Sequence, residues 1–194
     1  GQGELARRMA QRGAIVTAVD HSPAMLRVAN SYCNPSGITY VWGDARDPDT
    51  LPKGPFDVVV MNLMLMDVDD FQRVFASAAV LVGAGGAAVW TVMHPCFQSP
   101  YSEPLEDEQG RLTHRRVSHY APQWWRSSRP GTLRAALGAY HRTLSDYVNS
   151  FVGAGFDIRL MAEPVVAQHV PLEPDQECHR YIPPILGVFG VKRR

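Results

Sequence analysis

The sequence carries no surplus of charge of either sign, because lysine plus arginine number 19 and aspartate plus glutamate also number 19. A balanced chain lacks the broad positive field on which nucleic-acid binding depends, so we expect no nucleic-acid partner. No apolar run is long enough to span a bilayer, so we expect no membrane partner either. These absences favour a small molecule as the partner.

Cysteine is scarce and follows no pattern. Cys33, Cys96 and Cys178 are widely spaced and contain no CxxC pair, which favours reduced thiols in a cytoplasmic protein over a disulfide framework. The seven histidines form no HExxH motif and no paired ligand spacing. We therefore expect a cytoplasmic protein that binds no metal, with the oligomeric state left open, a homo-oligomer included.

The chain opens on a glycine turn that leads into a helix. Gly1 and Gly3 allow a tight turn and the close approach of a ligand, and residues 4–12 carry a helical apolar pattern. The N–H groups at the start of such a helix suit an anionic group. Residues 14–19 then form an apolar, β-branched run that predicts a buried parallel strand. The strand ends in Asp20, whose carboxylate can accept both ribose hydroxyls of a nucleoside.

Two further predicted strands also end in polar residues. Residues 38–42 are followed by Gly43-Asp44-Ala45, and residues 56–61 by Asn62. An open α/β sheet binds its ligand at the carboxyl ends of its strands, and a carboxylate such as Asp44 suits the exocyclic amine of adenine. Each residue has a structural alternative: the aspartates can cap turns, Asn62 can cap a strand end, and Met25 can be core.

The segments GQG, AVDHSPAML, WGDA and FDVVVMNLMLMDVDD together resemble the class I S-adenosylmethionine (SAM)-dependent methyltransferases, over about the first ninety residues. The resemblance implies an α/β fold with a Rossmann-like, mostly parallel sheet, helices on both faces and a C-terminal antiparallel strand pair. It implies an enzyme with SAM as cofactor. The family's motif begins with a strand that ends in an acidic residue and a glycine before the GxG. The chain starts at Gly1, so we expect the sequence to be truncated at its N-terminus.

The resemblance also assigns cofactor contacts and a reaction, the transfer of a methyl group to an oxygen, nitrogen or carbon of a small-molecule acceptor. The contacts are Gly1, Gln2, Gly3, Asn62 and Leu63 on the methionine side, Asp20 on the ribose, and His21, Met25, Asp44 and Ala45 around the adenine.

Two other functions are compatible with the same residues. Gly1-x-Gly3-x-x-Ala6, with Asp20 further on, also satisfies the dinucleotide fingerprint of an NAD-dependent oxidoreductase. The GDA turn, the terminal strand pair and the lack of a hydride-transfer residue set weigh against that alternative. A non-catalytic SAM-binding or scaffold protein is the second alternative.

The later part of the chain predicts a helix capped by Asp69 or Asp70, a strand over residues 87–93 and a helix that starts with a capping box at Thr143. Residues 156–162 and 185–191 predict two final strands that pair antiparallel, joined without a helix. We expect a single domain over residues 1–194.

Residues 94–142 interrupt the regular alternation, with a short helix near residues 133–140. A loop of this length is functional or disordered, and its aromatic residues favour an ordered lid over the acceptor, with a peripheral packing element as the alternative. Its arginines form either a solvated face or a site for an acidic group on the acceptor. They are Arg115, Arg116, Arg126, Arg129 and Arg134.

His94 is the leading candidate for a general base, because it follows a predicted strand at the edge where the ligand binds and because histidine titrates near neutrality. The alternative is a histidine that only ends the strand before Pro95. Weaker candidates for the base are His141, Tyr101, Tyr120 and Asp67.

Overall fold

The computed structural model describes residues 1–128, 130–131 and 133–194. The N-terminal part consists of α1 (Glu4–Gln11), β1 (Val16–Asp20), α2 (Pro23–Ser31) and β2 (Ile38–Trp42). β1 and β2 are parallel, with Val16 opposite Ile38 and Asp20 opposite Trp42. The hydroxyl of Ser22 caps α2, as the sequence predicted.

A second, four-stranded sheet has the order β3-β4-β10-β9. Its strands are β3 (Phe56–Asn62), β4 (Val82–Met93), β9 (Phe156–Ala162) and β10 (Ile185–Lys192). β3 and β4 are parallel, and β10 is antiparallel to both β4 and β9. The fold class is therefore confirmed, including the terminal antiparallel pair. The connection between β9 and β10 holds a 3-10 helix, η3 (Pro174–Arg180), which the sequence did not predict.

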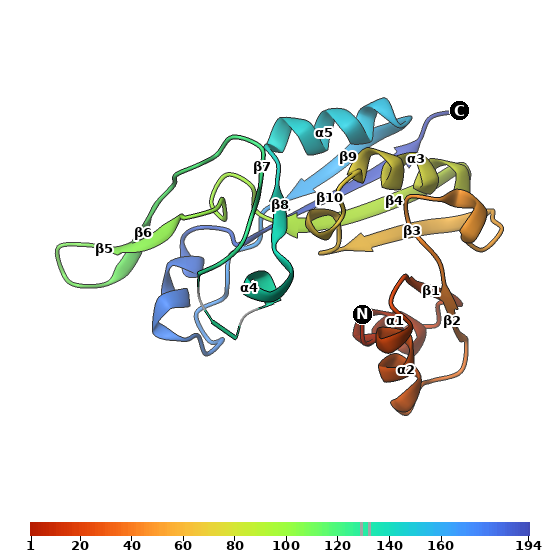
Figure 1. Ribbon diagram of the computed structural model, residues 1–194, viewed down its shortest axis with the longest axis horizontal. Helices are drawn as coiled ribbons and strands as arrows, with labels where there is room; N and C mark the ends of the chain where they lie inside the picture. The colour runs from red at the N-terminus through yellow and green to blue at the C-terminus, as the bar shows by residue number, and fades with distance from the viewer. Residues whose placement is uncertain (129, 132) are drawn as a thin grey trace.

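Within the described residues, the β1–β2 sheet and the four-stranded sheet both have unpaired edges, among them β1 and β3. Among the residues that the structure describes, β1 pairs only with β2, and β3 pairs on one side only, with β4. Figure 1 shows β1 and β2, with α1 and α2 beside them, as a unit set apart from the four-stranded sheet. The backbone groups along the free edges of β1 and β3 therefore lack strand partners within the described part of the chain.

Two helices, α3 (Phe71–Leu81) and α5 (Leu144–Gly153), cover one face of the four-stranded sheet (Figure 1). Asp70 caps α3, and Thr143 and Asp146 form the predicted capping box of α5. Aromatic rings fill the core between the helices and the sheet. The ring of Phe151 stacks on Phe156 at 4.6 Å and lies 5.3 Å from Phe75 and 5.9 Å from Trp90.

The described residues of the segment 94–142, which is called the lid after its expected role, form short elements. The antiparallel pairs are β5 (Glu103–Glu106) with β6 (Leu112–Arg116), and β7 (Gln123–Trp125) with β8 (Ala139–His141). The short helix expected near residues 133–140 is α4 (Leu133–Leu137), and β8 takes the remainder. None of the helices in the described ranges is long and apolar enough to cross a bilayer.

Candidate cofactor and acceptor site

The glycine turn sits where it can receive a ligand. Gly3 has φ 80° and precedes the first residue of α1, and any side chain at this position would collide with the hydroxyl of Tyr40. The guanidinium of Arg7 donates to the carbonyl of Gln2 at 2.9 Å and so holds the turn from inside. The turn thus needs glycine both for its backbone conformation and for the space around it.

Asp20 lies at the carboxyl end of β1 with its side chain 18% exposed. It accepts the N–H of Ser22 at 2.8 Å and forms an ion pair with the amino group of Gly1. The strand end therefore brings Asp20 and the glycine turn together. His21 and Met25 are exposed just beyond, at 83% of the His21 side chain and 41% of Met25, so Met25 is not part of the core.

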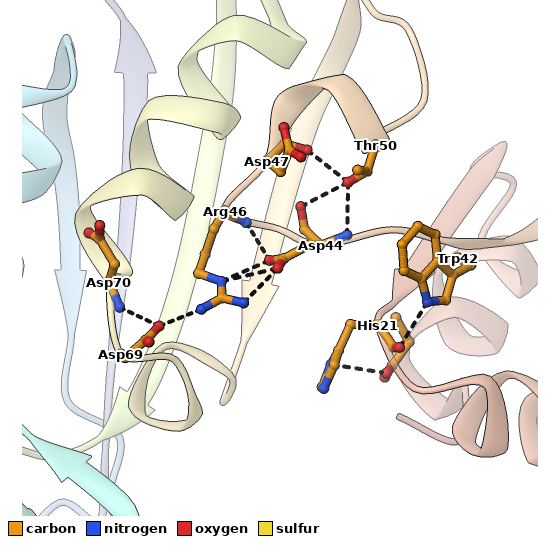
Figure 2. Close-up of polar contacts among 9 residues, drawn as sticks. His21, Trp42, Asp44, Arg46, Asp47, Thr50, Asp69 and Asp70 are labelled. Atoms are coloured by element: carbon orange, nitrogen blue, oxygen red, sulfur yellow. Dashed lines mark hydrogen bonds and ion pairs between the residues drawn. The ribbon is translucent and has the colours of Figure 1, made fainter.

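Asp44 is held in an ion-pair network that the sequence did not reveal (Figure 2). The guanidinium of Arg46 donates to both carboxylate oxygens of Asp44, at 2.6 Å from Nη2 and 3.0 Å from Nε. Nη1 of the same guanidinium donates to Asp69 at 2.6 Å. Arg46 therefore links the expected adenine-binding carboxylate to the start of α3. Ala45, between Asp44 and Arg46 in the sequence, packs against the core.

Replacing Arg46 with alanine is expected to raise the pKa of Asp44. The hydrogen bonds from the Arg46 side chain hold that pKa at about 2, against a usual value of 3.8. Because the pair favours the ionised carboxylate, its contribution to stability is complete above pH 3.8 and is lost as the pH falls toward 2. Carbon NMR titration of the Asp44 carboxyl group measures the shift.

Arg73, an exposed arginine of α3, provides the matched control for this titration. Arg73→Ala is expected to leave the Asp44 midpoint where it is in the wild type. An unchanged midpoint in Arg46→Ala would mean that the ion pair does not govern Asp44.

The end of β3 is shaped by an unusual backbone conformation. Leu63 has a backbone φ of 52°, a value that residues other than glycine rarely adopt. Its N–H donates to the carbonyl of Thr91 at 3.0 Å. The amide oxygen of Asn62 accepts the hydroxyl of Thr91 at 2.7 Å. Non-glycine residues with this conformation concentrate at functional sites, so the strain at Leu63 marks the expected methionine side as a site candidate.

Both ring nitrogens of His94 make hydrogen bonds within the protein. Its ring is 1% exposed, Nε2 lies 2.7 Å from Oε1 of Glu163, and Nδ1 accepts the N–H of Cys96 at 3.2 Å. A neutral ring that accepts at Nδ1 carries its proton on Nε2 and donates it to Glu163. These contacts favour a role for His94 in fixing the chain where it leaves β4, and its role as base stays a prediction.

A cavity of about 240 Å³ opens between the lid and the carboxyl end of β4. Met93 and Pro95 lie where β4 runs into the lid, and Met66 comes from η2 (Leu65–Asp67), which follows β3. Trp125 on β7 and Tyr140 on β8 form the lid side of the cavity. The structure therefore places a partly open space, with more apolar than polar lining, beside the strand ends expected to bind the cofactor.

Two arginines give this cavity a positive character. The Arg142 residue is 7% exposed, and its guanidinium donates to the carbonyls of Leu65, Val68 and Asp69. Within the described part of the chain, Arg142 makes no ion pair with a carboxylate, and its guanidinium lies 4.4 Å and 4.9 Å from the ring centroids of Phe71 and Tyr140. Arg134 also lines the cavity but is paired with Asp67.

The solved S-adenosylmethionine-dependent methyltransferase of Mesorhizobium loti is similar to this chain over 99% of its length and 87% of the solved chain, with a TM-score of 0.81 and 25% identity. Residues 1–90 match a family model described as "Methyltransferase domain". The matched region is a class I SAM-dependent methyltransferase domain. The family recognised from the GQG, WGDA and related segments is thus confirmed.

Two further proteins extend the comparison. The Ubiquinone biosynthesis O-methyltransferase of Vibrio parahaemolyticus is 34% identical over 101 residues, which are 51% of this chain and 43% of that protein. A glycopeptide N-methyltransferase solved with S-adenosyl-L-homocysteine has a TM-score of 0.68 and 19% identity over 99% of this chain and 79% of the solved one, which shows the fold alone. The chain spans about half the length of the curated relatives it matches.

The sequence did not identify two arginines that hold parts of the candidate site. Only the folded chain brings Arg46 to Asp44, and Arg142 to the carbonyls after β3. Of the lid arginines foreseen from the sequence, Arg115 donates to the carbonyl of Phe97 and Arg116 pairs with Glu103, whereas Arg134 reaches Asp67 outside the lid. Arg129 lies outside the described residues.

Proposed function

We propose that this chain transfers the methyl group of SAM to a small-molecule acceptor held in the cavity under the lid. The observation that carries the proposal is the position of the 240 Å³ cavity, which opens where β4 ends and the lid begins. β4 pairs directly with β3, and the cavity wall holds Met93, two residues beyond the Thr91 that faces Asn62. A ligand at the strand ends and a second molecule in the cavity would therefore be neighbours.

The residues that would hold SAM follow from the strand ends. In the turn of Gly1, Gln2 and Gly3, Gly1 has open space beside it for the methionine part, and Asp20 offers a carboxylate to the ribose. His21 and Met25 present exposed side chains to the adenine beside Asp44 and Ala45, and Asn62 and Leu63 face the methionine side. When bound, SAM supplies an electrophilic methyl group. The protein then has to align the acceptor with that group and exclude water.

Residues 94–142 are proposed as the lid and acceptor-binding insertion of a single domain over residues 1–194. Trp125 and Tyr140 of the lid, with Met66 and Met93 from the sheet side, would shield the acceptor from solvent. The curated relative of Vibrio parahaemolyticus is named as an O-methyltransferase of ubiquinone biosynthesis, and this supports a small organic acceptor here. Binding of NAD without binding of SAM would favour the oxidoreductase alternative.

Asp20→Ala is expected to weaken SAM binding by about 5- to 150-fold, which corresponds to about 1–3 kcal/mol. The variant would leave the ribose hydroxyls without their acceptor in a site from which water is excluded. Isothermal titration of SAM into wild type and variant measures the two dissociation constants.

Asp49, an exposed aspartate of η1 (Pro48–Thr50), offers a matched control. Asp49→Ala removes the same charge from the same half of the chain and is expected to leave SAM affinity unchanged. Equal affinities in wild type, Asp20→Ala and Asp49→Ala would contradict the assignment of Asp20 to the ribose.

A further inference from the structure

His141 is a second buried histidine, and it differs from His94 in how its nitrogens are used. His141 is 7% exposed on β8 and lines the 240 Å³ cavity. Its Nε2 lies 3.0 Å from the carbonyl oxygen of Tyr120. A carbonyl oxygen can only accept, so Nε2 carries the proton and Nδ1 of the neutral ring carries a lone pair. In the described ranges of the chain, Nδ1 has no hydrogen-bond partner.

Tyr120 fixes this arrangement from two sides. Its carbonyl accepts from His141, and its hydroxyl accepts the N–H of Leu144 at 2.9 Å, at the start of α5. The rings of Tyr120 and His141 meet edge to face at 5.6 Å. Tyr120 is therefore a positioning residue that sets both the tautomer and the orientation of the imidazole.

The charges around the cavity favour an acidic reacting group over an amine. Arg142 is buried at the cavity wall with its donors on backbone carbonyls and with no carboxylate contact in the described part of the chain. A developing negative charge on an acceptor oxygen would be stabilised by this guanidinium, whereas an ammonium would be repelled. The cavity thus suits a hydroxyl that loses its proton as it reacts.

The residues that line the cavity favour a flat molecule. The aromatic rings of Trp125, Tyr140 and Tyr147 line it, together with the thioethers of Met66 and Met93. Aromatic faces and polarisable sulfur contact planar rings favourably. An apolar cavity of about 150 Å³ is enough to bind benzene, so the 240 Å³ measured here admits one ring with substituents.

We propose that His141 is the general base of the acceptor cavity and that the acceptor is a small planar molecule whose reacting group is a phenol-type hydroxyl. The inference rests on the proposed methyl transfer. The hydroxyl proton moves to Nδ1 of His141 while the oxygen forms its bond to the methyl carbon. The electron pair of the broken carbon–sulfur bond stays on sulfur, so a methyl ether, a neutral thioether and an imidazolium result, and the imidazolium releases its proton to water.

The groups that face His141 set the pH range in which it can act. Burial lowers the pKa of His141 from its usual 6.5, against the opposing influence of Asp146 and of the Tyr120 carbonyl. Arg134, Arg142 and Tyr147 share the cavity with it. The ring is therefore neutral and able to accept a proton at pH 7, and turnover should fall as the pH drops through a value below 6.5.

The test compares phenol with 4-nitrophenol, whose hydroxyl is far more acidic, in the full chain with SAM. His141→Gln keeps an amide donor for the Tyr120 carbonyl but has no titrating nitrogen. We expect the variant to lose about 10²–10⁴-fold in turnover with phenol, to lose much less with ionised 4-nitrophenol, and to lack the acidic limb of the pH profile. His169→Gln, in an exposed loop outside the cavity, should behave as wild type.

A second measurement does not depend on turnover. In nitrogen-15 NMR spectra, neutral His141 should carry its proton on Nε2, and phenol should shift the Nδ1 resonance whether or not SAM binds. A proton on Nδ1, or no shift with saturating phenol or 4-nitrophenol, would overturn the inference, as would equal losses with both phenols. Absence of SAM binding in wild type would instead overturn the proposed function and leave the NMR result as the test of the cavity.

Discussion

Arg142→Ala is expected to lose both stability and methyl transfer. The guanidinium holds the carbonyls of Leu65, Val68 and Asp69, which lie between the end of β3 and the start of α3. Each buried carbonyl left without a donor costs about 1–3 kcal/mol, and each kcal/mol lowers Tm by about 2–4 °C in a chain of this size. The freed segment would also displace Met66 in the cavity wall, and misplacement of about 1 Å costs about 10²-fold in rate.

Thermal unfolding and a turnover assay test this pair of losses together. Arg142→Lys provides the informative comparison, because lysine keeps the charge but cannot reach three carbonyls with a planar fork. It should recover part of the stability and part of the turnover. If Arg142→Ala melts at the wild-type temperature, the guanidinium does not stabilise the segment after β3.

Phe151→Ala is expected to lower the free energy of unfolding by about 3–5 kcal/mol. The ring is fully buried, stacks on Phe156 at 4.6 Å and contacts Phe75 and Trp90 in the layer between α5 and the sheet. Gly190 on β10 is shaped around it, since a side chain at that position would meet the Phe151 ring. Urea unfolding followed by the signal of the buried Trp90 measures the loss.

Val152, the next residue of α5, is 38% exposed and provides a control on the same helix. Val152→Ala is expected to change the free energy of unfolding by no more than about 0.5 kcal/mol. Similar effects of the two substitutions would show that the aromatic layer is not the principal core.

The elements that were predicted correctly carry local signals. Three helices start at capping residues, which are Ser22, Asp70 and Thr143. Each side chain accepts a backbone N–H three residues further on, so the sequence reveals these helix starts directly. The strand at residues 38–42 was predicted to the residue because its apolar run is bounded by glycines. β4 was predicted to start at residue 87 but begins at Val82, because Phe56 pairs with it across the sheet.

The candidate site was harder to predict from the sequence, because its main contacts join distant parts of the chain. The sequence identified Asp44, but the guanidinium of Arg46 that binds it also reaches Asp69, and this geometry exists only after folding. The ranking of His94 above His141 rested on position along the chain. Hydrogen-bond partners, which the sequence does not contain, distinguish a ring held at both nitrogens from one held at Nε2 alone.

The separation of the two sheets bears on how tightly a cofactor can bind. Asp20 and the glycine turn belong to the β1–β2 unit, whereas Asn62 and Leu63 belong to the four-stranded sheet, and no strand pairing joins them within the described ranges. A ligand that contacts both units binds only the arrangements in which they are correctly placed. Contacts from both units to one molecule would join the two sheets where the backbone does not, so such a ligand would stabilise the fold as well as occupy the site.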